Sequence, residues 1–234
     1  MNGSKDQILA RIREALRSQA PVPGNHDYSH LAMTPSRPKP ELENFRQWLP
    51  PVESNSENQW DLLTKSFHAL KTDFGLLESK ARLIDFVLEL QRVEQWKRVG
   101  IHHGAMTDEI ASHLEIEKLW VDEGYDPQAM EQCEVGISEC DAIVAQTGSI
   151  LITAKSGGGR GLSVLPPHHL VLARTSQIVP DLPSAYELLY KRYGGNFPSM
   201  ISFITGPSRT GDIERIVVLG AHGPKKLTVA ILKD

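Results

Sequence analysis

Strand-like and helix-like segments alternate through the middle of the chain, and this alternation constrains the fold more than any other feature. Apolar strand-like runs lie near 98–103 and 119–122, and a helix-like segment follows each of them. Two longer segments with apolar residues at helical spacing, 57–70 and 80–96, come first. Such alternation is typical of parallel sheets, because parallel strands are joined by crossover helices. The sequence therefore predicts an α/β fold with a mixed, mainly parallel sheet flanked by helices.

The second half of the chain begins with a predicted hairpin. Apolar segments at 142–145 and 149–153 flank Gln146, Thr147 and Gly148, a sequence that favours a tight turn. We expect this hairpin to add antiparallel strands to the sheet. The remaining predicted elements are a strand at 169–173, a helix at 183–193 ended by Gly194 and Gly195, and strands at 201–204 and 227–232.

The first 56 residues have a different character. Residues 4–17 begin with a capping box and continue with apolar residues at helical spacing, which predicts a short amphipathic helix. Seven of the fifteen prolines follow within 21–51, where they disfavour both helix and sheet. We therefore predict an N-terminal helical arm and linker over 1–56 and an α/β domain over 57–234.

Composition excludes several classes of protein. The net charge of −4 and the isoelectric point near 6.1 give no basic field for nucleic acid. No apolar run has the length of a membrane span and no apolar block follows the first residues, so we expect a cytoplasmic protein. The two cysteines, Cys133 and Cys140, are too few for a cluster or a zinc site, and we expect no metal or cofactor in this chain.

The turn TGPSRTGDIE at 205–214 is rich in hydrogen-bond donors. Thr210 or Asp212 can cap a short helix, and the first N–H groups of such a helix bind anions. Arg209 adds a planar, permanently charged group that matches a carboxylate or a phosphate. An ordinary strand-to-helix turn in which Arg209 pairs with Asp212 or Glu214 explains the same residues, and the sequence leaves both interpretations open.

Two other turns carry polar groups. Thr147, Gly148 and Ser149 can present hydroxyl groups to a ligand carboxylate, or can form an ordinary hairpin turn. His222 lies within GAHGP at 220–224, where an imidazole either exchanges a proton with a ligand or bonds to its own loop.

A third glycine-rich loop and a histidine pair have weaker signals. The loop SGGGRG at 156–161 contains Arg160 but lacks the spacing of a nucleotide-binding motif, so a flexible hairpin exit is the favoured interpretation. His168 and His169 enter a predicted buried strand without the spacing of metal ligands, and no metal site is predicted.

Three motifs together, TGPSRTGDIE, GAHGP and AQTGSILI, closely resemble the lactate-utilisation protein C family, whose characteristic unit is the LUD domain. The resemblance runs from about Ile101 to the C-terminus, with a looser match at residues 4–16. It implies a fold like that of sugar-phosphate isomerases and coenzyme A transferases. It also implies a role in oxidising L-lactate to pyruvate beside iron–sulfur partner proteins.

Three functions are compatible with these observations. The first is a component of L-lactate utilisation that binds a small anionic metabolite or docks iron–sulfur proteins, with homo-oligomer formation left open. The second is a stand-alone enzyme acting on a phosphorylated, acyl-CoA or folate substrate, an idea that rests on fold analogy. The third is a metabolite-binding or assembly module without chemistry. The sequence does not decide whether the chain itself is an enzyme.

The residues predicted to bind the substrate are Thr147, Gly148, Ser149, Gly206, Ser208, Arg209, Thr210 and His222. No catalytic residue is assigned. The family pattern has an acidic residue where this chain has Gln146, which removes a carboxylate from the Thr-Gly-Ser turn. Coenzyme A transferases of the related fold use a glutamate nucleophile, and Glu139 is the nearest candidate here, without a matching motif.

Overall fold

A computed structural model describes residues 56–122, 124–210, 218–220 and 222–234, with isolated positions at 10, 11, 13, 14, 17 and 52. The chain divides into two compact units, residues 1–45 and 46–234. In the first unit, residues 10, 11, 13 and 14 are helical, within the segment predicted as a helix. The proline-rich segment lies outside the described residues, and the boundary at residue 56 stays a prediction.

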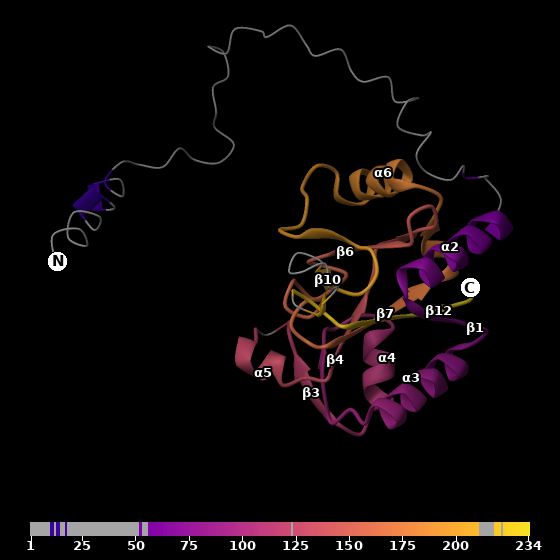
Figure 1. Cartoon of the computed structure of the whole chain (residues 1–234), viewed down its shortest axis with the longest axis horizontal. Coiled ribbons are helices and arrows are strands. Elements are labelled where there is room, and N and C mark those ends of the chain that lie inside the picture. Colours follow the sequence, from indigo (N-terminus) through magenta and orange to yellow (C-terminus); the bar gives the residue numbers. More distant parts are fainter. Residues whose placement is uncertain are drawn as a thin grey trace, which may run out of the picture. The chain divides into compact units, whose positions relative to one another are not determined.

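Six parallel strands form the main sheet of the second unit, in the order β1-β12-β7-β4-β2-β3. This confirms the predicted mainly parallel α/β fold (Figure 1). The strands are β1 (Asp73–Leu77), β2 (Arg98–Ile101), β3 (Glu117–Trp120), β4 (Val135–Glu139), β7 (His168–Arg174) and β12 (Lys226–Leu232). Neither β1 nor β4 was among the strands expected from the sequence.

One face of the main sheet is covered by α3 (Lys80–Glu94) and α4 (Thr107–His113). Ser79 begins α3 because its side chain accepts a hydrogen bond from the Arg82 N–H at 3.3 Å. The apolar stripes of the two helices pack on alternate strand residues in one buried core. That core includes Leu83, Val87, Ile110, Val99, Ile137, Leu170 and Ala230.

The opposite face is covered by α2 (Ser56–Leu70) and by a second sheet of order β8-β5-β6-β9. These strands are β5 (Ala142–Val144), β6 (Ser149–Thr153), β8 (Ile178–Val179) and β9 (Ile201–Ile204). The predicted hairpin is present, since β5 and β6 pair antiparallel. Its predicted addition to the main sheet is wrong, because it belongs to this separate sheet.

Burial explains why the hairpin leaves the main sheet. Every residue of β5 and β6 is buried, so both faces of the hairpin need apolar cover. One face packs toward the main sheet, with Ile143 and Ile150 in the same core as Val229. The other face packs under α6 (Leu182–Tyr193), through a core that includes Ala142, Val144, Leu151, Ala185 and Leu189. The helices and the two sheets therefore form successive layers (Figure 1).

A loop and a short helix complete the cover over β2 and β4. Leu162 in the loop and Met130 in α5 (Pro127–Glu131) are fully buried in one core. They approach the sheet where Gly100 and Gly136 pair in register. A Cβ atom at Gly136 would lie 2.2 Å from the Leu162 carbonyl oxygen, so only glycine permits this approach.

Among the described residues, no helix combines the length and the apolar character that a membrane span requires.

Candidate functional site

A cavity of about 430 Å³ lies where the C-terminal end of α2 meets the loops that follow β9 and precede β12. It combines apolar side chains with hydroxyl groups, an imidazole and a guanidinium. The residues that line it are Leu70, Ser163, Val164, Ile204, Thr205, Gly206, Pro207, Ser208, Arg209, His222, Gly223 and Pro224. Arg209 is the only one of these that is charged at every physiological pH. We call this space the Arg209 cavity.

Arg209 is held against the end of α2. One guanidinium nitrogen, Nη2, donates a hydrogen bond to the carbonyl oxygen of Leu70, the last residue of that helix. A helix C-terminus carries about half a negative charge, which a nearby cation stabilises. Since the guanidinium carries a full charge and five N–H donors, the pair keeps a net positive charge and donors beyond the one used. The predicted partners Asp212 and Glu214 lie outside the described residues.

The segment after Arg209 differs from the prediction. Residues Arg209–Thr210 form β10, which pairs antiparallel with β11 (Val218–Leu219). The alternative in which Thr210 caps a helix is therefore wrong, and no helix N-terminus at Thr210 supplies N–H groups to a ligand. The other predicted cap, Asp212, lies outside the described residues. The sequence IVVL at 216–219 is rich in β-branched residues, which favour strands. Residues 211–217 lie outside the described part of the chain.

Backbone hydrogen bonds join the two donor-rich turns. The Ser208 N–H donates to the Pro224 carbonyl at 2.9 Å, and the Gly220 N–H donates to the Ser208 carbonyl at 3.0 Å. The TGPSR turn and the GAHGP turn therefore form one unit. This brings His222 and Arg209 to the same cavity, although they are 13 residues apart in the sequence.

The Thr-Gly-Ser turn reaches the cavity through hydroxyl groups. Thr147 Oγ1 lies 2.7 Å from Ser149 Oγ, which lies 2.8 Å from Thr205 Oγ1 on the cavity wall. Gly148 has φ 62°, and a Cβ atom there would lie 2.8 Å from the Leu70 side chain. The turn therefore packs against the end of α2, and it connects to the ligand space through Thr205 without lining it directly.

The structure brings most of the predicted binding residues together. Gly206, Ser208, Arg209 and His222 line the cavity. Thr147, Gly148 and Ser149 lie behind it, and Thr210 continues into β10. Sequence reasoning missed the other lining residues, which are Leu70, Ser163, Val164, Ile204, Thr205, Pro207, Gly223 and Pro224. Those in the TGPSR and GAHGP motifs had a signal, because these turns stand out in the sequence. Leu70, Ser163 and Val164 had none, because they come from distant parts of the chain.

Two other candidates have structural roles away from this cavity. Glu139 Oε1 accepts hydrogen bonds from the N–H groups of Met106 at 2.7 Å and Thr107 at 3.2 Å, where α4 begins. The Glu139 carboxylate thus caps a helix. The loop at 156–161 does not line the Arg209 cavity, and its Gly158 packs against His102 and Val121.

Metal ligands do not gather in the described residues, where no three His, Cys, Asp or Glu side chains form a possible metal site. Cys133 and Cys140 are free and buried. His168 and His169 are buried in β7, where each Nε2 contacts a hydroxyl group, Thr228 Oγ1 and Ser138 Oγ respectively, at 2.8 Å.

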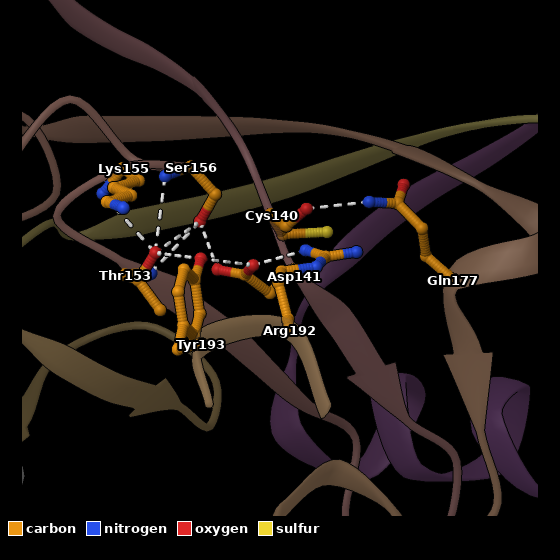
Figure 2. A network of polar contacts seen from close by, with 8 residues as sticks. All are labelled: Cys140, Asp141, Thr153, Lys155, Ser156, Gln177, Arg192 and Tyr193. Atoms are coloured by element: carbon orange, nitrogen blue, oxygen red, sulfur yellow. Dashed lines mark hydrogen bonds and ion pairs between the residues drawn. The ribbon is translucent and has the colours of Figure 1, made fainter. Parts of the chain in front are cut away.

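A buried carboxylate, Asp141, organises the far end of the second sheet. Figure 2 shows the side chains of Ser156, Arg192 and Tyr193 around it. Its Oδ1 accepts hydrogen bonds from Arg192 Nη1 and from the Tyr193 hydroxyl at 2.9 Å, and its Oδ2 accepts one from Ser156 Oγ at 2.5 Å. Burial and the Asp141 carboxylate together raise the pKa of Tyr193, so its hydroxyl remains a donor. Asp141 therefore ties α6 to the loop after β6.

Replacement of Asp141 with asparagine tests this structural role. We expect a loss of about 2 kcal/mol in the free energy of unfolding, because a buried ion pair loses its charge while Arg192 still reaches solvent. The Arg192 side chain is 45% exposed, which limits the penalty. Ser156→Ala removes a neutral hydroxyl that donates to Asp141 and accepts from the Thr153 N–H at 3.0 Å, and it is expected to lose about 1 kcal/mol. Urea unfolding of both variants measures the two losses in the free energy of unfolding. Equal stability of Asp141→Asn and wild type would show that the network contributes nothing.

Comparison with known proteins gives matches to one family. Residues 115–232 match the family model described as LUD domain. Lactate utilization protein C of Geobacillus kaustophilus is 35% identical over 108 residues, which are 45% of each chain. The protein of the same name from Halalkalibacterium halodurans is 31% identical over 210 residues, covering 84% of this chain and 86% of its own. The Geobacillus match thus spans less than half of that relative.

The fold also has a solved counterpart. A crystal structure of a DUF162 family protein from Deinococcus radiodurans matches with a TM-score of 0.61, covering 77% of this chain and 99% of its own. The sequences are 15% identical, so this likeness concerns the fold.

Proposed function

Because this chain belongs to the LUD domain family, we propose that it takes part in lactate utilization and binds an anionic metabolite in the Arg209 cavity. The observation that carries the binding proposal is the position of Arg209. Arg209 lines a cavity that Thr205, Ser208 and His222 also line, and its guanidinium is held by the carbonyl oxygen of Leu70, another lining residue. A carboxylate accepts charge-assisted hydrogen bonds from such a group.

In this proposal, other chains carry out the oxidation of L-lactate to pyruvate. Iron–sulfur clusters are usually held by four cysteine thiolates, and this sequence has only Cys133 and Cys140, at 1% and 3% exposure. Burial raises the pKa of Cys133 to about 11, so its thiol stays protonated at neutral pH. We therefore assign any iron–sulfur cluster to partner proteins. The chain would contribute ligand binding or docking to the assembled system.

Genetic replacement tests both parts of the proposal. Deletion of the gene from its host is expected to abolish conversion of L-lactate to pyruvate in lysate, and purified wild-type protein should restore it. Arg209→Ala should restore at least tenfold less, because the anion loses a charged partner worth about 1.5–3 kcal/mol. The variant should lose only about 1 kcal/mol of stability, from the helix terminus.

Arg160→Ala is the matched control, since Arg160 is exposed and does not line the Arg209 cavity. It should restore conversion fully. Unchanged conversion after deletion, in a host without another lactate oxidase, would refute the role in lactate utilization. Full restoration by Arg209→Ala would refute the role of the cavity.

A further inference from the structure

We propose that the Arg209 cavity is built for an organic anion with an extended apolar body, larger than lactate or pyruvate. The inference rests on the proposed anion binding and names the class of ligand. The negative group would meet Arg209, and the apolar body would cover the wall formed by Leu70, Val164, Ile204, Pro207 and Pro224.

The volume of the cavity is the first argument. Pockets for drug-sized ligands have volumes of about 300–1,000 Å³, and this cavity, at about 430 Å³, lies in that range. Lactate is much smaller than a drug-sized ligand and fills only part of such a space. Most of the apolar wall would stay wet beside such a small ligand.

The exposure of the wall is the second argument. Val164 lines the cavity and is 40% exposed, although large aliphatic side chains are usually buried. The other apolar members of the wall come from separate parts of the chain, including the end of α2 and the end of β9. Covering them with an apolar group is favourable by about 25 cal/mol per Å².

The cation and the apolar wall adjoin each other. Leu70 lines the cavity, and its carbonyl oxygen holds the Arg209 guanidinium. Thr205 lies next to Ile204 on the same wall, and its hydroxyl is held by Ser149. A ligand with a carboxylate at one end of an alkyl or aryl body therefore satisfies both kinds of surface at once.

Titration calorimetry of the full-length protein tests this with straight-chain carboxylates from acetate to decanoate, with lactate, and with the corresponding neutral amides. We expect the Kd to fall roughly two- to fourfold for each added methylene until the wall is covered. Each amide should bind at least tenfold more weakly than its acid, because it lacks the charge that pairs with Arg209.

Two variants test whether the apolar wall causes the dependence on chain length and whether Arg209 causes the preference for acids over amides. Val164→Ser should flatten the dependence on chain length, and Arg209→Gln should remove the preference for acid over amide. Val93→Ser is the control, because Val93 on α3 is 60% exposed and does not line the cavity. Circular dichroism confirms that each variant is folded.

Three outcomes separate the hypotheses. If acids bind with dependence on Arg209 but acetate binds as tightly as decanoate, this inference is wrong and the anion-binding proposal stands. A dependence on chain length that Val164→Ser leaves unchanged would place the apolar body elsewhere and overturn the inference. If no carboxylate binds at all, the proposed anion binding fails together with it.

Discussion

Replacement of Gly136 with alanine is expected to lower the free energy of unfolding by more than about 3 kcal/mol, a large fraction of the stability of a typical domain. Gly136 lies in β4, and an added Cβ atom would be 2.2 Å from the carbonyl oxygen of Leu162. That atom belongs to the backbone, so it cannot turn aside as a side chain would. The buried loop must shift as a whole, and overpacking of this kind usually destabilises by 1–3 kcal/mol or more.

Gly100→Ala is the matched control, because Gly100 pairs with Gly136 in the neighbouring strand. Its added Cβ atom would meet Met130 Sδ at 2.7 Å and Leu162 Cδ1 at 2.9 Å. Both are atoms near the ends of flexible side chains, so a smaller loss of about 1–2 kcal/mol is expected. Urea unfolding followed by circular dichroism compares the two variants. Equal losses would contradict the close approach of the Leu162 backbone.

Local sequence patterns predict the helices and strands of this fold better than they predict which strands pair with each other. Alternation of strands and helices indicated the parallel sheet, and Gly194 after residue 193 marked the end of α6. Strand β1 has the sequence DFGLL, which is short and begins with a charge, and within the described residues its one partner is β12, at the far end of the chain. The hairpin was visible as local turn chemistry. Its place in a second sheet depended on long-range burial that no local pattern encodes.

The same division holds for the candidate site. The loop residues Gly206, Ser208, Arg209 and His222 could be predicted, because polar groups in turns with glycine stand out in a sequence. The partner of Arg209 could not, because it is a backbone carbonyl at the end of a helix 139 residues away. Val164 was missed for a similar reason, since an apolar residue in a loop carries no signal of the cavity that it lines.

Two buried histidines should make the protein sensitive to acid. His168 and His169 are 4% and 0% exposed in β7, and in the described structure neither Nδ1 has a hydrogen-bond partner. The pKa of His168 is lowered from 6.5 to about 4, mainly by burial and also by the nearby charge of Lys226, against a smaller opposite effect of Glu94. Burial also lowers the pKa of His169 to about 3, with additional contributions from His168 and His102.

The direction of the pH effect follows from proton binding. The two folded-state pKa values lie below 6.5, so the unfolded chain binds protons that the folded chain excludes once the pH falls below about 6.5. The free energy of unfolding is therefore not reduced by these two histidines above about pH 6.5. Below it, the free energy of unfolding falls as the pH decreases toward 4 for His168 and toward 3 for His169. Each group lowers the folded-to-unfolded ratio by roughly tenfold per pH unit within its window.

The combined loss between pH 7 and pH 4 is expected to be on the order of 5 kcal/mol, comparable with the total stability of many domains. Urea unfolding at intervals from pH 7 to pH 4 measures the slope. The double variant His168→Gln, His169→Gln keeps a polar group toward Thr228 and Ser138 but cannot be protonated, so its slope should be much shallower even if it is less stable overall. His113→Gln, on the exposed side of α4, should keep the wild-type slope. An unchanged slope in the double variant would show that acid unfolding is governed by carboxylates instead.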